Sequence, residues 1–195
     1  MLGHSFPTRR SSDLYGREGS ECLSDYVVSS YTPTLQALLA SPVPQPDADS
    51  FKMLVVIQPE APRYLSHASP SLPSTRDELR KVEQHVSSEY LVKLGVPEAA
   101  ASVDNVVLHL SDASIAHFAC HGIQDITNPL ESALILDDGK LPVSQIMKTS
   151  MPNASLAFLS ACETAKGDAN VPDEAMHLAG TMLFAGFRGA VVTMW

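Results

Sequence analysis

The sequence predicts an α/β fold: a three-layer α/β/α sandwich around a mostly parallel sheet. Short runs of apolar, often β-branched residues alternate with helical patterns along the chain, which is the order of elements in parallel α/β folds. Several of these runs lack polar residues at alternate positions, so we expect strands that are buried on both faces. With 195 residues, of which 45% are hydrophobic, one domain can bury a sizeable core.

Two strands are predicted in the first third of the chain. Tyr26–Tyr31 is rich in β-branched and aromatic side chains, which favour a strand. Residues 33–39 follow as a short helix with a proline near its first turn. Prolines then interrupt residues 41–46, which fit neither a helix nor a central strand. Met53–Ile57 is an unbroken apolar run, so we predict a buried strand there.

An amphipathic helix is predicted to begin at Ser74. The spacing of Ser74 and Asp77 is close to that of a capping box, in which a side chain satisfies backbone N–H groups of the first helical turn. Apolar residues follow at three- and four-residue steps, which places them on one helix face. These residues are Leu79, Val82, Val86 and Tyr90.

A second helix and two strands are predicted in the middle of the chain. Ser102 is expected to open the helix, because an apolar stripe follows it directly. The stripe consists of Val103, Val106, Val107 and Leu110. Ser114–Cys120 and Ala154–Ala161 are apolar runs that we predict to be neighbouring parallel strands.

Shorter elements are predicted around these strands. Residues 133–139 have the pattern of a small strand followed by an Asp-Asp-Gly turn, and Leu141–Lys148 is expected to be a short helix. A further helix should begin near Pro172, with acids in its first turn, and end before Gly186 in a left-handed cap. Ala190–Trp195 is the last predicted strand.

Composition excludes several classes of function. The formal net charge of −9, with no basic stripe, argues against nucleic acid and anionic membranes as partners. The longest apolar runs are far shorter than the roughly 20 residues that span a bilayer. Three cysteines at irregular spacing do not form a disulfide framework, so we expect a reducing, cytoplasmic environment.

Both ends of the chain are unusual. His4–Leu14 resembles the translation of a sequencing-adapter oligonucleotide, so we expect residues 1–20 to be artefactual or disordered and exclude them from the fold. At the other end, a terminal strand without a following helix leaves one face of a parallel sheet uncovered. We therefore expect the domain to occupy residues 21–195 and to be incomplete at its C-terminal end.

Two of the predicted strands lead directly into reactive side chains. One continues into His121-Gly122 and the other into Cys162. If the strands are parallel neighbours, their C-terminal ends meet at the sheet edge where open α/β folds place ligand chemistry. An imidazole beside a thiol there can take the thiol proton and leave a thiolate nucleophile. Both residues also have structural interpretations, since free cysteine is often buried and a lone histidine near a strand is often structural.

Neighbouring residues are weaker candidates. Cys120 alternates with His121 and should face a helix layer, where it packs, whereas His109 and His117 are expected to be structural or surface residues. A metal site formed by Cys120, His121 and Cys162 is disfavoured, because adjacent strand residues point to opposite faces and no CxxC spacing is present. Nucleotide and serine-hydrolase signatures are absent, so we expect no cofactor.

Several ordered motifs resemble one known family. The motifs are Phe118–Gly122, Asn128–Leu136, Leu159–Ala165, Glu174–Gly180 and Phe184–Trp195. Together they resemble the CHAT domain, a caspase-like cysteine peptidase module that often follows TPR repeats. The resemblance implies a caspase-like version of the predicted sandwich.

The resemblance also implies roles for individual residues. His121 and Cys162 correspond to the catalytic dyad, in which the cysteine sulfur attacks a peptide carbonyl and the histidine handles its proton. The backbone N–H groups of Gly122 and Cys162 would stabilise the oxyanion. Ser160, two residues before the cysteine, would help to line the primary substrate pocket together with Glu163.

Ser160 bears on specificity because it is uncharged and too short to pair with a charged substrate side chain. If the pocket holds no other charge, we expect it to prefer small or apolar residues. Acidic residues that could change this by reaching into the pocket are Asp137, Asp138, Glu163 and Asp168.

The leading hypothesis is a cysteine endopeptidase that acts on a protein or peptide substrate. The resemblance implies that it is the effector part of a larger signalling protein with TPR or sensor domains. One alternative is a catalytically silent CHAT-like interaction scaffold. Another is a ligand-binding α/β receiver domain, whose function would not depend on Cys162 at all.

Overall fold

A computed structural model provides the structure of the protein. The described residues are 50–63, 70–123, 125, 127–160, 180 and 182–192, and all of them belong to one compact unit, Leu39–Trp195. The strand predicted at Tyr26–Tyr31, the helix predicted at residues 33–39 and the N-terminal segment 1–20 lie outside the described residues.

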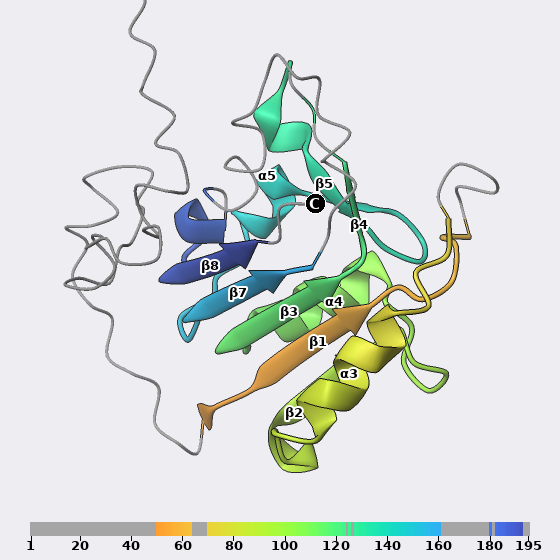
Figure 1. The fold of residues 1–195 in the computed structure, drawn as a ribbon. Coiled ribbons are helices and arrows are strands. Elements are labelled where there is room, and N and C mark those ends of the chain that lie inside the picture. The colour runs from red at the N-terminus through yellow and green to blue at the C-terminus, as the bar shows by residue number, and fades with distance from the viewer. Residues whose placement is uncertain are drawn as a thin grey trace, which may run out of the picture. The chain divides into compact units, whose positions relative to one another are not determined.

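Five parallel strands form the central sheet (Figure 1). They are β1 (Met53–Ile57), β2 (Leu91–Leu94), β3 (Ile115–Ala119), β7 (Leu156–Leu159) and β8 (Gly189–Val192). Their order across the sheet is β2-β1-β3-β7-β8, and each neighbouring pair is parallel. β1, β3 and β7 confirm three predicted strands, and β8 confirms the last one as far as it is described. β3 and β7 are neighbours, as predicted.

Helices cover both faces of this sheet, so the predicted three layers are confirmed. α3 (Thr75–Glu83) lies in front of the sheet in Figure 1, and α4 (Val103–Leu110) lies behind it. The α3 face buries a small apolar cluster of Val55, Ile57, Leu79 and Ala119. The α4 face buries a larger cluster that includes Val106, Leu110, Phe118 and Leu159.

The two helices begin differently. Ser102 caps α4 as predicted: its backbone is extended, and its hydroxyl accepts a hydrogen bond from the Asn105 N–H at 3.3 Å. The capping box predicted at Ser74 is wrong. Ser74 already has helical backbone angles and makes no capping hydrogen bond with its side chain, because a capping residue needs an extended backbone to direct its oxygen at the first turn. Instead, the Thr75 hydroxyl donates to the Leu72 carbonyl at 2.7 Å.

The predicted helix is also shorter than its apolar stripe. α3 ends at Glu83, before Val86 and Tyr90, and a 3₁₀ turn, η3 (Ser88–Tyr90), leads into β2. Tyr90 packs edge to face against Phe51, with ring centroids 6.0 Å apart. The helical spacing of the apolar residues is only a weak local preference. The pairing of β2 with β1 and the contact between Tyr90 and Phe51 are stronger, so the helix ends early.

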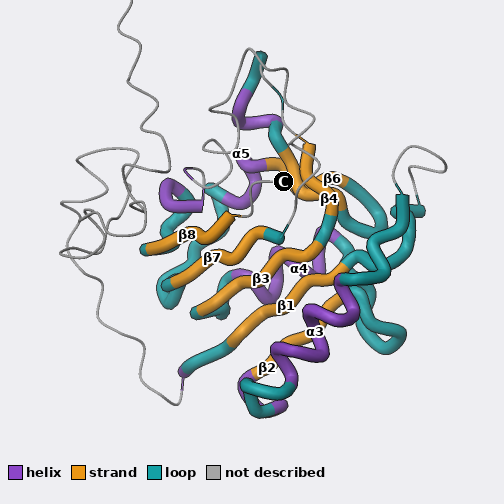
Figure 2. Tube along the Cα trace, viewed as in Figure 1, coloured by secondary structure: helices purple, strands orange, loops and turns teal. Residues whose placement is uncertain are grey.

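A second, smaller sheet follows β3 (Figure 2). Its antiparallel strands are β4 (His121–Ile123), β5 (Ala133–Ile135) and β6 (Lys140–Pro142), with the 3₁₀ turn η4 (Pro129–Glu131) before β5. The strand and turn predicted over residues 133–139 are confirmed. The helix predicted at Leu141–Lys148 is reduced to α5 (Val143–Ile146). Leu141 lies in β6, because pairing with Leu134 buries it completely.

The C-terminal cap is confirmed where the chain is described. Residues 182–184 are helical, and Gly186 has φ +119°, which favours glycine. The Phe187 N–H donates to the Met182 carbonyl at 3.0 Å, and the Gly186 N–H donates to the Leu183 carbonyl at 3.2 Å. These two bonds are those of a Schellman cap, which turns the chain into β8.

Candidate active site

His121 is the first residue of β4, directly beyond the C-terminal end of β3. Its side chain is only 3% exposed, and its Nε2 lies 2.7 Å from the Pro70 carbonyl oxygen, on the segment that leads into α3. A carbonyl oxygen only accepts, so Nε2 donates the hydrogen in this bond. In neutral imidazole the lone pair is then on Nδ1. The fold therefore fixes both the orientation and the tautomer of His121.

The remaining predicted catalytic residues have different outcomes. Gly122 is buried and pairs with Leu134 of β5, one residue beyond His121. Cys162 and Glu163 lie outside the described residues. The pairing of His121 with Cys162, and the oxyanion role of the backbone N–H groups of Gly122 and Cys162, therefore stay predictions.

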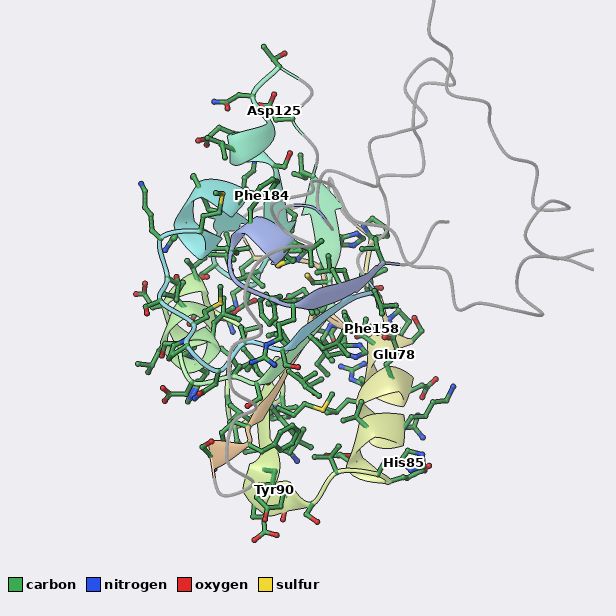
Figure 3. All side chains as sticks on the ribbon, turned by 90° about the vertical axis from the view of Figure 1, so that its left-hand side faces the viewer. Glu78, His85, Tyr90, Asp125, Phe158 and Phe184 are labelled. Carbon is green, nitrogen blue, oxygen red and sulfur yellow. The ribbon has the colours of Figure 1, made fainter. Side chains whose placement is uncertain are left out.

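Ser160 lies at the end of β7 and contacts a glutamate that the sequence analysis did not single out. Its hydroxyl donates to Glu78 Oε1 at 3.0 Å, while the other carboxylate oxygen, Oε2, lies 3.0 Å from His117 Nε2. We call Glu78, His117 and Ser160 the Glu78 cluster. Figure 3 shows Glu78 on α3 beside the sheet. One carboxylate thus links a helix to the two neighbouring strands β3 and β7.

The surroundings of Glu78 keep its carboxylate ionised. Burial alone would raise the pKa of Glu78, but the hydrogen bonds from His117 and Ser160, together with electrostatic attraction to His117 and Lys81, outweigh it. The net result is a pKa below the ordinary value of 4.5. His117 is held in place by stacking on Phe158, with ring centroids 4.8 Å apart and an interplanar angle of 19°. His117 is therefore a structural residue, as predicted.

Alternation along the chain separates His121 from Cys120. His117 and Ala119 face α3, and His121 continues this alternation toward the segment before α3. Cys120 faces the other way, into the larger cluster on the α4 side, where it is fully buried. Burial raises the pKa of the Cys120 thiol to about 12. Cys120 is therefore a packing residue, as predicted, and a poor nucleophile.

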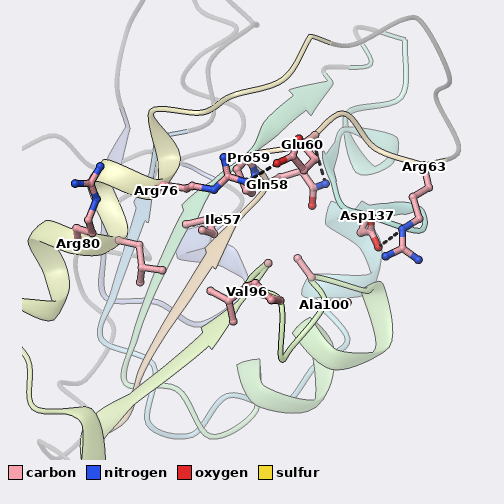
Figure 4. Close-up of a pocket in the computed structure, with 14 residues that line it drawn as sticks. Ile57, Gln58, Pro59, Glu60, Arg63, Arg76, Arg80, Val96, Ala100 and Asp137 are labelled. Carbon is pink, nitrogen blue, oxygen red and sulfur yellow. Dashed lines mark hydrogen bonds and ion pairs between the residues drawn. The ribbon is translucent and has the colours of Figure 1, made fainter.

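A cavity of about 530 Å³ lies beyond the C-terminal ends of β1 and β2 (Figure 4). Apolar residues such as Ile57 and Val96 line it together with three arginines, Arg63, Arg76 and Arg80. Each arginine pairs with a carboxylate: the partners are Asp137, Glu60 and Asp77, respectively. Neither His121 nor Ser160 lines this cavity, so it is distinct from the predicted catalytic centre.

Two acidic residues considered for the substrate pocket are engaged elsewhere. Asp137 pairs with Arg63 at 3.1 Å in the cavity beyond β1 and β2. Asp138 accepts a hydrogen bond from the Val103 N–H at 2.9 Å, at the start of α4. Asp168 lies outside the described residues. The acid that contacts Ser160 is Glu78 instead.

Comparison with known protein families matches residues 5–195 to the CHAT domain. The chain belongs to this family. CHAT domains are caspase-like, peptidase-related modules, and the mostly parallel sheet with helices on both faces agrees with a caspase-like fold. The curated proteins contain no significant match to the sequence.

Two structural features are absent from the described residues. No helix in the described part is both long and apolar enough to cross a lipid bilayer. Within the same residues, no group of three or more His, Cys, Asp or Glu side chains is placed to hold a metal ion.

The two site contacts that sequence reasoning missed have different explanations. Pro70 acts through its backbone carbonyl, which every residue has, so the sequence contains no signal for it. Glu78 does have a weak signal. It precedes Val82 by four residues in α3, which places it on the same helix face as the apolar stripe. A glutamate on the inward face of a helix needs a partner.

Proposed function

We propose that this CHAT domain is a cysteine endopeptidase in which Cys162 is the nucleophile and His121 is the general base and acid. The observation that carries the proposal is the hydrogen bond between His121 Nε2 and the Pro70 carbonyl. It holds the imidazole at the C-terminal edge of the parallel sheet with its lone pair on Nδ1.

In the proposed reaction the Cys162 thiol transfers its proton to Nδ1 of His121 as the sulfur attacks the peptide carbonyl carbon. The backbone N–H groups of Gly122 and Cys162 stabilise the oxyanion that forms. As the C–N bond breaks, the imidazolium returns the proton to the leaving amine, and a thioester remains. Water, deprotonated by His121, then hydrolyses the thioester and releases the acid product.

The Pro70 carbonyl supports this role of His121 electrostatically. When the imidazole is protonated, Nε2–H carries part of the positive charge and donates its hydrogen bond to the Pro70 carbonyl oxygen at 2.7 Å. An acceptor at this position stabilises the imidazolium and prevents the ring from rotating, as the third member of a catalytic triad does. A backbone carbonyl thus replaces an orienting carboxylate.

The biological setting that we propose follows from the family. The domain acts as the proteolytic effector of a larger cytoplasmic signalling protein, in which TPR or sensor domains control access to a protein or peptide substrate. Its acidic charge of −9 is unsuited to nucleic acid or anionic membranes as partners.

A thiol-reactive peptide-ketone probe tests the dyad directly. We expect wild-type protein to be labelled and Cys162→Ala not to be labelled. His121→Ala should react about 10²–10⁴-fold more slowly, which is the usual contribution of a general base. Cys120→Ala is the matched control, and its labelling should be unchanged because the Cys120 thiol is fully buried.

Mass spectrometry of the labelled peptide identifies the site of modification. Labelling that persists in Cys162→Ala, or that is insensitive to His121→Ala, would contradict the proposed dyad. A folded wild-type protein that no peptide ketone labels would favour a catalytically silent interaction module.

A further inference from the structure

We propose that Glu78 forms the acidic wall of the primary substrate pocket and selects Lys or Arg on the amino side of the cleaved bond. This inference rests on the proposed function and names its substrate class. A preference for Lys or Arg replaces the preference for small or apolar residues expected at Ser160. That expectation held only if the pocket contained no other charge.

The position of Glu78 is the first argument. Its carboxylate contacts Ser160, two residues before Cys162, and two extended residues span at most about 7 Å. Its partner His117 lies on β3, four residues before His121 and on the same face of the chain. The carboxylate therefore lies on the same face as His121, near the C-terminal ends of β3 and β7. If the scissile bond is held at this edge of the sheet, a long substrate side chain next to it can reach the Glu78 carboxylate.

The hydrogen-bonding capacity of Glu78 is the second argument. An ionised carboxylate has about four acceptor positions, and in the described structure His117 and Ser160 occupy one on each oxygen. The Glu78 side chain is 31% exposed, so part of it is accessible to a ligand. A guanidinium or ammonium group can donate to the remaining acceptor positions without displacing His117 or Ser160.

Glu78 Oε2 pairs with His117, and the other neighbouring charges leave the carboxylate available to a ligand. Arg76 and Arg80 on the same helix pair with Glu60 and Asp77, and both line the cavity beyond β1 and β2. Lys81 interacts with Glu78 only through its charge, and it is exposed, where salt screens it. A substrate cation in direct contact gains the charge-assisted hydrogen bonds that Lys81 does not make.

Matched peptide pairs provide the test. Peptides that differ only by Arg or citrulline on the amino side of the cleaved bond have nearly the same shape but differ in charge. We expect kcat/KM for the Arg peptide to exceed that for the citrulline peptide by about tenfold or more, because a site built for a polar partner rejects analogues that leave it unpaired. The same order is expected for Lys over acetyl-lysine.

Two single-residue variants test whether Glu78 causes the preference for Arg over citrulline. Glu78→Gln keeps the shape and removes the charge, so the Arg-to-citrulline ratio should fall to near one. Glu83→Gln is the matched control: Glu83 is an exposed acid on the same helix that pairs with Lys93, and its removal should leave the ratio unchanged. Circular dichroism of both variants verifies that α3 is intact.

The outcomes separate this inference from the proposed function. If Cys162→Ala abolishes cleavage but wild type cleaves Arg and citrulline peptides equally, the inference is wrong and the dyad stands. If no peptide is cleaved, calorimetry measures the affinities of the same two peptides for Cys162→Ala and so tests whether Glu78 selects the charged side chain. Equal affinities for the two peptides would overturn the role of Glu78 independently of catalysis.

Discussion

At the scale of single residues, Glu78 joins parts of the chain that are distant in sequence. It accepts hydrogen bonds from His117, 39 residues away, and from Ser160, 82 residues away. A partly buried carboxylate is favourable only when such donors replace the water that it loses. The hydrogen bonds of the Glu78 cluster therefore contribute to stability.

Acid should weaken this contribution. The pKa of Glu78 is lowered from its ordinary value of 4.5, so the stabilisation is complete above about pH 4.5 and is lost as the pH falls through the lower folded-state value. We expect wild type to be more stable than Glu78→Gln at pH 6, and the difference in free energy of unfolding to shrink toward pH 3. Urea titrations of both proteins across this range measure it. A difference that is constant with pH would show that the carboxylate charge is not responsible.

The sequence predicted part of this site and not the rest, for reasons that are visible in single residues. His121 could be found because it follows an apolar strand and precedes a glycine. The Pro70 carbonyl and the Ser160–Glu78 contact could not be found, because both are created only when distant segments meet. The preference for small or apolar residues at Ser160 was conditional on the absence of other charges, and the nearby carboxylate of Glu78 belongs to another element, α3.

At the scale of elements, the β1–β2 pair was the hardest part of the fold to predict. β1 was found because Met53–Ile57 is continuously apolar, as a strand buried on both faces is. β2 was missed because Leu91–Leu94 follows the helical stripe without an intervening proline or glycine. The next glycine in the sequence, Gly95, follows the last residue of β2 and so does not mark where the strand begins.

Gly95 fixes the close approach of these two strands. It has φ +88°, and a Cβ atom there would lie 1.7 Å from the Ile57 carbonyl oxygen. We expect Gly95→Ala to lower the free energy of unfolding by at least about 1–3 kcal/mol, because it adds a backbone clash to an unfavourable conformation. Gly139→Ala is the control: its Cβ would meet only a Val103 methyl group at 3.4 Å.

Urea denaturation of the two glycine variants makes the comparison. A Gly95→Ala protein as stable as Gly139→Ala would mean that the ends of β1 and β2 can separate at little cost. In that case the cavity beyond them, which Gly95 and Ile57 help to line, would not have a fixed shape.

At the scale of the whole described unit, the two sheets share one apolar core. The larger buried cluster contains residues of both sheets: Phe118 and Leu159 come from the parallel sheet, and Leu134 and Leu141 come from the small antiparallel sheet. The small sheet carries His121 and Gly122 at its first strand. Packing that joins the sheets therefore also positions His121 against Pro70.

Leu134→Ala tests this coupling. Leu134 is fully buried and pairs with both Gly122 and Leu141, so we expect its truncation to cost about 2–5 kcal/mol of unfolding free energy through lost burial and a cavity. Leu108→Ala, on α4 and 65% exposed, should change stability by less than about 0.5 kcal/mol. Because the core is continuous, far-UV circular dichroism and tyrosine fluorescence should report one coincident transition in Leu134→Ala. Two separate transitions would show instead that the small sheet unfolds on its own, and His121 would then lose its position before the parallel sheet melts.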